Sequence, residues 1–365
     1  MVANENLTAI GLMSGTSMDG IDAAVLRTDG ERIDGFGPSL SIPYEAAFRD
    51  RLRAVLGRDL SDGAETLAVA EDLTGYHNEA VRQLLSENGV DPGTVDVIGF
   101  HGHTVFHQPD QGITCQIGDG GWLAQETGIS VVCDFRANDV AHGGQGAPFV
   151  PLYHAALSWN YEKPLAVLNI GGVANVTCIS PDDGLIAFDT GPGNALIDDW
   201  VREHGQGEMD MGGHLAHGGQ VDEEALARLL DNPYFTQPYP KSLDRDDFDP
   251  SPVAHLSVAD GAATLTAFSV GAVEKAVHLF PALPNRWLVC GGGRHNLAIM
   301  AALRRLLIQP VEPVEMAGWQ GDALEAQAFA FLAVRSLKGL PLSLPSTTGV
   351  SEPVSGGVLH RPDGG

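Results

Sequence analysis

Small and acidic residues crowd the tip of a predicted hairpin near the start of the chain. The segment GLMSGTSMDGID, residues 11–22, joins two apolar runs, 9–13 and 21–26. A hairpin tip needs only two to five residues and one or two glycines. Small residues let the backbone NH groups approach an anion, and hydroxyls and carboxylates can complete the site. We therefore expect a phosphate-like ligand here, with a tight turn closed by its own Ser and Asp side chains as the alternative.

Three further glycine-rich turns have the same character. The segment LAVLNIGGVANVTCI, residues 165–179, repeats the strand, turn and strand of the first hairpin about one domain length later. DTGPGN, residues 189–194, precedes a predicted helix whose free NH groups and dipole favour an anion. LVCGGGRHN, residues 288–296, places three glycines between a strand and a helix. A flat ring or a sugar could lie against that backbone.

Asp189 is the acidic residue best placed for chemistry. It directly follows the apolar run LIAF, which predicts the carboxyl end of a buried strand beside a helix N-terminus. Ligands of open α/β sheets bind at such ends. Asp189 could act as a general base that accepts a proton from a nucleophile. Helix capping is the structural alternative.

Three histidines lie close together in GFHGHTVFHQP, namely His101, His103 and His107. In an extended chain, HxH points both rings to one side, and such pairs bind zinc. No HExxH or CxxC pattern accompanies them. Hydrogen bonding to a ligand or packing of the loop is therefore favoured over a zinc site.

Two more polar pairs could contact a substrate. Arg136 and Asp139, in CDFRANDVAHGGQGAP, could orient a substrate that carries a carboxylate and hydroxyls, or could form an ordinary ion pair. Asp322 and Glu325 begin a predicted helix, where favourable charge at the N-terminus explains them. Contact with a substrate is the alternative for this pair.

The charge balance excludes several classes of partner. The 365 residues include 21 basic and 47 acidic side chains, for a formal charge of −26. Such a surface repels nucleic acids and anionic lipid headgroups. No stretch of about 18 uncharged apolar residues occurs, and the first residues lack a secretory pattern. We expect a cytoplasmic protein with no nucleic acid or membrane partner.

The order of elements predicts an α/β fold with two similar lobes. The lobes are expected at residues 1–145 and 146–340, with the junction in the Gly- and Pro-rich segment 141–157. The turn-rich tail, residues 340–365, could pack on the first lobe. Strands are expected at 95–100, 129–135, 184–189 and 286–291, and helices at 194–204, 258–280, 296–307 and 322–337.

The glycine turns favour an ATPase without a P-loop. Neither GxxxxGK[ST] nor GxGxxG occurs, and the chain has only four lysines. Phosphate charge would therefore be met by backbone dipoles, arginine and a divalent cation such as Mg²⁺. Glycine tips on two lobes that face each other are typical of the actin-like, ribonuclease H-like fold, with a ligand cleft between the lobes.

Several motifs together resemble the anhydro-N-acetylmuramic acid kinases of bacterial cell-wall recycling. They are GLMSGTSMDGIDAAV, HGHTVFHQP, DFRANDVAHGGQGAPFVP, NIGGVANVT, FDTGPGNALID, CGGGRHN, GDALEAQAF and PSTTG. The matches run in order from residue 10 to about residue 349. The resemblance implies an enzyme that opens the internal bridge of 1,6-anhydro-N-acetylmuramic acid with water at C1. The γ-phosphate of ATP is transferred to O6, which gives N-acetylmuramic acid 6-phosphate and ADP.

The resemblance also implies roles for individual residues. Asp189 would activate the attacking water, and the sugar would be bound by Arg136, His101, Thr104 and Glu325. ATP, with Mg²⁺ held through its phosphates, would be bound by Gly15, Thr16, Ser17, Met18, Asp19, Gly20, Ile21, Asp22, Gly171, Gly172, Gly291, Gly292 and Gly293.

This chain departs from the family pattern at two positions. His103 stands where the family usually has Gln in HGQT, so the role of this position is open. Met13 stands where other kinases of the fold have a leading Asp, so no metal ligand is assigned to Asp19 or Asp22. Two alternative functions remain: a non-catalytic actin-like ATP-binding regulator and a zinc hydrolase. The protein could also form a homodimer.

Overall fold

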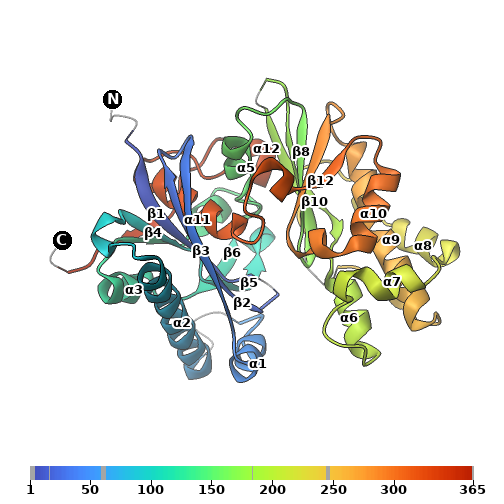
Figure 1. The fold of residues 1–365 in the computed structure, drawn as a ribbon, viewed down its shortest axis with the longest axis horizontal. Coiled ribbons are helices and arrows are strands. Elements are labelled where there is room, and N and C mark those ends of the chain that lie inside the picture. Colours follow the sequence, from blue (N-terminus) through green and yellow to red (C-terminus); the bar gives the residue numbers. More distant parts are fainter. Residues whose placement is uncertain (1–4, 16, 59–62, 183, 244–246, 364–365) are drawn as a thin grey trace. The chain divides into compact units, whose positions relative to one another are not determined.

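The chain divides into two compact units (Figure 1). Unit 1 comprises residues 1–159 and 323–365, and unit 2 comprises residues 160–322. The computed structural model describes residues 5–15, 17–58, 63–182, 184–243 and 247–363. Each unit is an α/β structure built around its own sheet, as the sequence predicts.

The unit boundaries fall elsewhere than at 145/146 and 340. Helix α5 (Pro151–Leu157) belongs to unit 1, because the hydroxyl of Tyr153 donates to Gln327 of helix α11 (Leu324–Leu337) over 2.9 Å. Helix α11 itself packs on the sheet of unit 1. The first boundary therefore lies after residue 159, and the second lies before α11.

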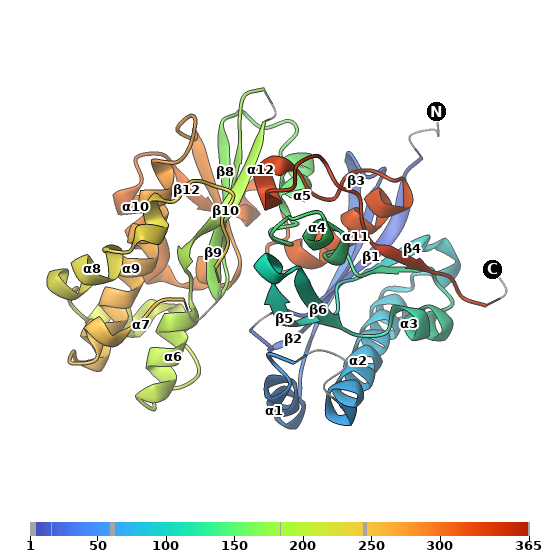
Figure 2. The ribbon, with the colours of Figure 1, turned by 180° about the vertical axis from the view of Figure 1, so that it is seen from behind.

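The described part of unit 1 contains a six-stranded sheet in the order β13-β7-β4-β1-β2-β3. Strands β1, β2 and β3 form an antiparallel meander, and β1, β4 and β7 are parallel neighbours. The chain's tail returns to this unit, where β13 pairs with β7 (Figure 2). The strands are β1 (Leu7–Met13), β2 (Gly20–Thr28), β3 (Ile33–Pro43), β4 (Val97–Phe100), β7 (Val131–Cys133) and β13 (Val358–His360).

The described part of unit 2 contains a five-stranded sheet, in the order β10-β9-β8-β11-β12, that repeats this plan. Strands β8, β9 and β10 form the meander, and β8, β11 and β12 are parallel neighbours. Each strand thus has a counterpart in unit 1, which confirms the predicted duplication. The strands are β8 (Leu165–Ile170), β9 (Val173–Ile179), β10 (Leu185–Pro192), β11 (Arg286–Cys290) and β12 (Val311–Pro313).

Helices cover the sheets of both units. In unit 1 they also include α1 (Ala46–Ala54), α2 (Ala64–Asn88), α3 (Gly120–Thr127), α4 (Ala137–Ala141) and α12 (Pro345–Thr348), and a two-stranded sheet of β5 (His103–Gln108) and β6 (Ile113–Ile117) is added. In unit 2 they are α6 (Ala195–Glu203), α7 (His214–Gly218), α8 (Glu223–Leu230), α9 (Val258–Val277) and α10 (Leu297–Leu306), with short 3-10 turns η4 (Met211–Gly213), η5 (Pro233–Thr236), η7 (Gly292–His295) and η8 (Val314–Ala317). The helices predicted at 194–204, 258–280, 296–307 and 322–337 are all present with small shifts at their ends.

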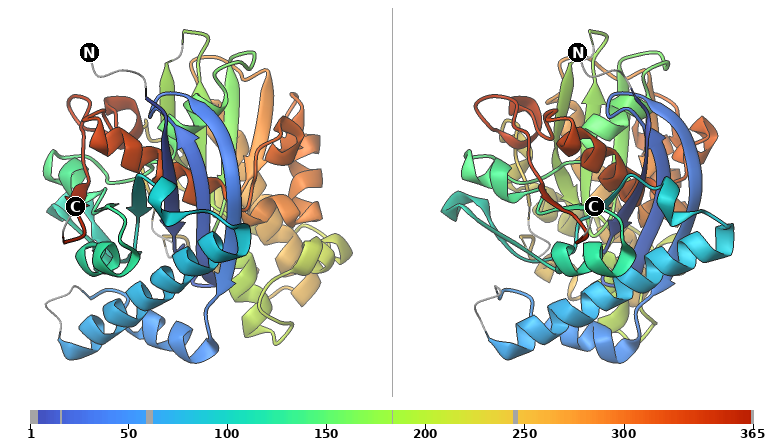
Figure 3. Two further views of the ribbon diagram at one scale, coloured as in Figure 1. Left: turned by 60° about the vertical axis from the view of Figure 1, so that its left-hand side comes forward. Right: turned by 90° about the vertical axis from the view of Figure 1, so that its left-hand side faces the viewer.

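Two long helices cover opposite faces of the unit 1 sheet (Figure 3). Ile10 and Leu12 of β1 point into a core shared with α2. Because side chains alternate along a strand, Gly11 between them faces α11. A Cβ atom at Gly11 would lie 1.7 Å from the carbonyl oxygen of Ala326, and one at Gly99 would lie 2.1 Å from that of Phe329. Helix α11 therefore rests directly on the backbone of β1 and β4.

No described helix is long and apolar enough to cross a membrane.

We predict that Gly11→Ala destabilises unit 1 by about 3 kcal/mol, because the methyl group forces α11 away from β1. The matched control is Gly75→Ala in α2, where a Cβ atom would meet nothing within 4 Å. That change should stabilise the helix by about 0.5–1 kcal/mol. Urea unfolding midpoints of the two variants and the parent protein test this. Equal midpoints for the two variants would contradict the proposed close contact.

Candidate functional site

In unit 1, the predicted residues gather at one edge of the sheet. The hairpin tip follows β1, His101 follows β4, and Arg136 lies shortly after β7. Strands β1, β4 and β7 are parallel neighbours, so their carboxyl ends lie at the same edge. Glu325, in the first turn of α11, belongs to the same unit. The sequence had placed these residues in four separate motifs.

The hairpin tip is held in place by a buried residue at its centre, Met18. Met18 adopts a positive φ of 55°, and its side chain is buried in the core of unit 1. Its NH donates to the carbonyl of Gly15 over 3.0 Å. The carbonyl of Asp19 accepts from the NH of Tyr44 over 2.9 Å. The buried Met18 therefore fixes the turn.

Other tip residues remain at the surface. Ser17 and Asp19 are exposed, and the hydroxyl of Ser17 donates to the carboxylate of Asp19. Gly15, Gly20 and Asp22 are half-buried, whereas Ile21 is buried in the core. Thr16 lies outside the described residues. The tip thus combines the self-bonded turn expected as the alternative with a surface of small polar residues.

A chain of hydrogen bonds ties the start of the tip to β5. The hydroxyl of Tyr44 donates to Ser14 Oγ over 2.8 Å, and Ser14 Oγ lies 3.0 Å from Nδ1 of His103. The Ser14 hydroxyl has one proton to donate and two positions that accept, so it links Tyr44 to the imidazole in either tautomer. Both Ser14 and His103 are almost fully buried. The sequence left the role of His103 open. In the structure, its hydrogen bond to Ser14 holds the residue that precedes Gly15.

His101 and Arg136 form a second pair that shapes the neighbouring loop. Nε of Arg136 donates to Nε2 of His101 over 3.0 Å, and Nδ1 of His101 lies 2.9 Å from the carbonyl of Gly102. The imidazole is therefore neutral, with its proton on Nδ1. Burial and the nearby guanidinium hold the pKa of His101 well below its usual value.

Arg136 and Asp139 meet at the backbone of one residue. The guanidinium of Arg136 donates to the carbonyl of Gly146 over 2.5 Å, and Asp139 accepts the NH of Gly146 over 2.7 Å. The other oxygen of Asp139 accepts from the hydroxyl of Thr348 over 2.6 Å. Asp139 is buried, so its role here is to hold the GGQGAP loop.

The three histidines do not form a zinc site. His101 bonds to Arg136, His103 to Ser14, and His107 to the hydroxyl of Thr114 and the carbonyl of Gln145. The chain between His101 and His103 is not extended as the HxH pattern assumes, because Gly102 has a positive φ of 72°. Among the described residues, no group of three or more His, Cys, Asp or Glu side chains could hold a metal ion.

Thr104 and Glu325 complete the predicted residues of unit 1. The hydroxyl of Thr104 accepts a hydrogen bond from Gln116 of β6 over 3.2 Å. Glu325 is half-buried in the first turn of α11.

In unit 2, the second glycine turn and the DTGPGN motif are parts of one structure. The carbonyl of Gly171 accepts the NH of Asn194 over 2.8 Å, and the carbonyl of Gly172 accepts the NH groups of Gly193 and Ala195. Of these NH groups only that of Ala195 belongs to α6, so the backbone of the second tip occupies the first NH group of the helix. A Cβ atom at Gly193 would lie 2.2 Å from the oxygen of Gly171, which explains the glycine there.

The third glycine motif is packed more tightly than expected. Gly291 has a positive φ of 73°, and a Cβ atom there would lie 2.4 Å from Oδ1 of Asn169. A Cβ atom at Gly293 would lie 2.3 Å from the side chain of Ile170. At Gly292 the nearest atom would be 3.8 Å away. Two of these glycines therefore seat the turn on the end of β8, and Gly292 has open space in front of it.

Asp189 lies within β10 rather than at its end. The strand continues to Pro192, with a bulge between Asp189 and Gly191. The sequence GPG had indicated that the strand ends there. The carboxylate accepts the NH of Leu243 over 2.8 Å, and the NH of Asp189 donates to the carbonyl of Lys241 over 3.1 Å. The side chain is about nine-tenths buried, so it is shielded from bulk water.

Lys241 and Tyr234 accompany Asp189, and sequence reasoning missed both. The hydroxyl of Tyr234 donates to the carbonyl of Asp189 over 2.6 Å, and Nζ of Lys241 donates to the carbonyl of Tyr234 over 2.8 Å. Nζ also lies 4.2 Å from the centre of the Tyr234 ring. Burial lowers the pKa of Lys241 to about 8, against the opposing pull of the Asp189 carboxylate. A lysine flanked by aromatic residues in an apparent loop was the available signal.

This arrangement suits base catalysis in a shielded place. Asp189 offers a carboxylate within an apolar strand, and a buried cation lies near it. Such a cation favours the ionised carboxylate, which is the form that accepts a proton.

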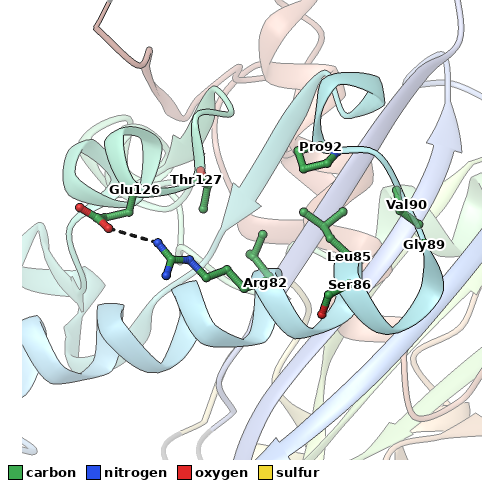
Figure 4. Close-up of a pocket in the computed structure, with 9 residues that line it drawn as sticks. Arg82, Leu85, Ser86, Gly89, Val90, Pro92, Glu126 and Thr127 are labelled. Carbon is green, nitrogen blue, oxygen red and sulfur yellow. Dashed lines mark hydrogen bonds and ion pairs between the residues drawn. The ribbon is translucent and has the colours of Figure 1, made fainter.

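A pocket of about 380 Å³ lies at the C-terminal end of α2 (Figure 4). Leu85, Val90 and Pro92 form its apolar side, and an ion pair of 3.4 Å joins Arg82 to Glu126 at its rim. None of its lining residues is a predicted site residue.

The chain matches the family model described as anhydro-N-acetylmuramic acid kinase over residues 7–362. A protein of that name from Rhodospirillum rubrum is 55% identical over 96% of this chain and 93% of its own length. Another from Paramagnetospirillum magneticum is 53% identical over 98% of this chain and 100% of its own length. Among solved structures, component A of (R)-2-hydroxyglutaryl-CoA dehydratase from Acidaminococcus fermentans has a TM-score of 0.48 at 11% identity, over 90% of this chain and 99% of that one. Our fold assignment rests on the sheet topology described above.

We predict that the stability of unit 1 falls as the pH drops from about 7 to 5. Burial lowers the pKa values of His77, His103 and His107 to about 4, below their usual 6.5. Between these values the unfolded chain binds more protons than the folded one, so the free energy of unfolding decreases with falling pH. His103 alone should account for about 2 kcal/mol of the loss by pH 5.

His103→Gln tests this share, because glutamine can accept from Ser14 and does not titrate. Urea midpoints measured at pH 7.5, 6 and 5 should fall less steeply for the variant than for the parent protein. His142→Gln, at an exposed position, is the matched control and should leave the slope unchanged. Identical pH dependence in His103→Gln and the parent would show that this imidazole is not held neutral.

Proposed function

This chain belongs to the anhydro-N-acetylmuramic acid kinase family, and on that premise we propose how its residues divide the reaction among them. The chain is a phosphotransferase of cell-wall recycling that uses ATP. Neither a non-catalytic regulator nor a zinc hydrolase has support from the comparisons. The buried carboxylate of Asp189 is the observation that carries the assignment of residues.

Asp189 is the general base in the proposed mechanism. It removes a proton from a water molecule that attacks C1 of the anhydro sugar. The C1–O6 bond breaks, its electron pair goes to O6, and O6 attacks the γ-phosphorus of ATP. The bond from the γ-phosphorus to its bridging oxygen then breaks, and ADP leaves. The proton stays on Asp189 until it returns to solvent, so one carboxylate starts both bond changes.

Lys241 keeps Asp189 ready for this step. Its ammonium group is held by the carbonyl of Tyr234 and lies over the Tyr234 ring, so it is a fixed charge rather than a mobile one. A positive charge near a carboxylate stabilises its ionised form. Lys241 thereby offsets the negative charge that Asp189 carries into the protein interior.

The hairpin tip 15–22 binds ATP phosphates in this proposal, and Gly171 and Gly172 contact phosphate as well. Support comes from the small residues of the tip and from its rigid anchoring by Met18 and Ser14. With two carboxylates in the tip and few lysines nearby, a divalent cation is needed to offset phosphate charge. We propose that Mg²⁺ supplies it while bound mainly to the phosphates.

The open backbone at Gly292 receives the nucleoside, with Gly291 and Gly293 holding the turn in place. The sugar is bound by Arg136, His101, Thr104 and Glu325. The guanidinium of Arg136 suits the lactyl carboxylate of the sugar, because its planar fork matches a carboxylate. We place the enzyme in the cytoplasm, where ATP is available.

The direct test of this function is ADP release with purified protein, ATP, Mg²⁺ and 1,6-anhydro-N-acetylmuramic acid. ADP and N-acetylmuramic acid 6-phosphate should appear in equal amounts and in proportion to the sugar consumed. ADP release that does not depend on the sugar would rule out the proposed kinase reaction.

We predict that Asp189→Asn lowers kcat by about 10²–10⁴-fold, because the amide cannot take the proton. The amide oxygen can still accept from the NH of Leu243, so folding should be preserved. ATP affinity, measured by calorimetry, should stay within about twofold of the parent value. Ring opening and phosphorylation should be lost together, as followed by mass spectrometry. Ring opening that persists without phosphorylation would contradict a single base.

We predict that kcat/KM declines as the pH rises through about 8, where Lys241 loses its proton. The neutral amine no longer offsets the charge of Asp189. In Lys241→Arg this decline should move to higher pH, because a guanidinium stays charged. Lys275→Arg, on α9, is the control that should leave the profile unchanged. A pH profile of Lys241→Arg identical to that of the parent would disprove the role of this ammonium group.

A further inference from the structure

Arg294 is a buried cation inside the glycine turn proposed for the nucleoside. Its side chain is only 3% exposed, although it follows three glycines in a connection between a strand and a helix. A guanidinium buried to this extent needs acceptors for its NH groups. The positions of those acceptors show what the residue holds together.

The acceptors come from three separate segments of unit 2. Nη1 donates to the carbonyl of Gly291 over 2.9 Å, and Nε donates to Glu315 of η8 over 2.8 Å. Nη2 donates to the carboxylate of Asp322 over 2.5 Å. The hydrogen bond to Arg294 lowers the pKa of Asp322, so this carboxylate stays ionised. One side chain thus joins the nucleoside turn to the end of unit 2.

The backbone beside Asp322 lies directly on this cluster. A Cβ atom at Gly321 would be 2.4 Å from Oε1 of Glu315 and 2.6 Å from Nε of Arg294. A side chain at this position would displace Glu315 or Arg294, so segment 321–322 is seated on the guanidinium as well as bonded to it.

Asp322 is also the last residue of unit 2. Ala323 begins the second part of unit 1, and Glu325 lies in the first turn of α11. That turn is fixed on β1, because the carbonyl of Ala326 rests against Gly11. Only two residues therefore separate the carboxylate that Arg294 holds from the glutamate proposed to bind the sugar.

We propose that Arg294 is a positioning residue that couples nucleotide binding to sugar binding through Asp322. A nucleoside bound against Gly292 would restrict the motion of the turn and of the Gly291 carbonyl. Because Arg294 bonds to both this carbonyl and Asp322, the start of α11 would become more ordered as well. The coupling is reciprocal, so each ligand tightens the binding of the other by the same factor. This inference rests on the proposed function of the turn and of Glu325.

The test is the dissociation constant of 1,6-anhydro-N-acetylmuramic acid, measured by calorimetry with and without saturating Mg²⁺-ADP. ADP carries no transferable γ-phosphate, so binding is measured without turnover. In the parent protein we expect ADP to tighten sugar binding by about tenfold, within the usual range for coupled sites. In Asp322→Ala the factor should fall to about twofold or less.

Two matched variants separate coupling from general damage. Glu315→Gln removes a charge from the same guanidinium but leaves its bond to Asp322, and should keep most of the factor. Glu312→Ala removes the partner of Arg286, an ion pair of 3.2 Å between β11 and β12, and should keep all of it. Asp322 is 78% exposed on its side chain, so Asp322→Ala should fold, and its thermal midpoint will confirm that.

The outcomes distinguish this inference from the proposed function. Sugar binding that ADP tightens equally in the parent and in Asp322→Ala overturns the role of Arg294 and Asp322 and leaves the proposed function intact. Sugar binding that ADP does not affect in the parent overturns the coupling itself. Absence of sugar binding in the parent, with and without ADP, overturns the proposed function and the inference with it.

Discussion

The direct contact between helix α11 and the backbone of β1 and β4 determines the arrangement of unit 1. It is possible only because Gly11 and Gly99 have no side chains, since a Cβ atom at either would lie about 2 Å from a helix carbonyl. At this separation Phe329 of α11 reaches the ring of His101, with centres 4.5 Å apart. The first turn of α11, which carries Glu325, is held beside the strand that leads into the hairpin tip. One close contact thus aligns three of the predicted ligand-binding segments.

The two units share a topology but close their hairpins by different means. In unit 1 the tip is long, and side chains hold it: Met18 enters the core and Ser14 bonds to Tyr44 and His103. In unit 2 the tip has only Gly171 and Gly172 between its strands, and their carbonyls accept the NH groups of residues 193–195 at the start of α6. A short tip cannot bury a side chain of its own, so it is stabilised by backbone hydrogen bonds. The duplicated fold therefore holds one hairpin tip by side chains and the other by backbone hydrogen bonds.

Features that depend on local sequence pattern could be predicted from the sequence. Features that depend on contacts between residues far apart in the chain could not. Hairpins, helices and the duplication are visible because apolar spacing and glycine turns recur along the chain. The unit boundaries are not visible, because α11 packs on strands such as β1 and β4 that lie far earlier in the sequence. Asp189 was identified from the strand before it, but the bulge that carries the strand on to Pro192 was not. Tyr234 and Lys241 reach Asp189 from segments more than forty residues away, and no spacing rule connects them.

Three cations in this acidic protein share a use that the net charge of −26 conceals. Arg136 donates to the carbonyl of Gly146, Lys241 to that of Tyr234, and Arg294 to that of Gly291. Each cation therefore holds the backbone of a loop or turn beside a residue proposed for the reaction. Burying a cation without hydrogen-bond acceptors would cost free energy. The loop carbonyls supply these acceptors, and the bonds restrict the conformation of the loops. The few basic residues at these positions act first on the shape of the loops.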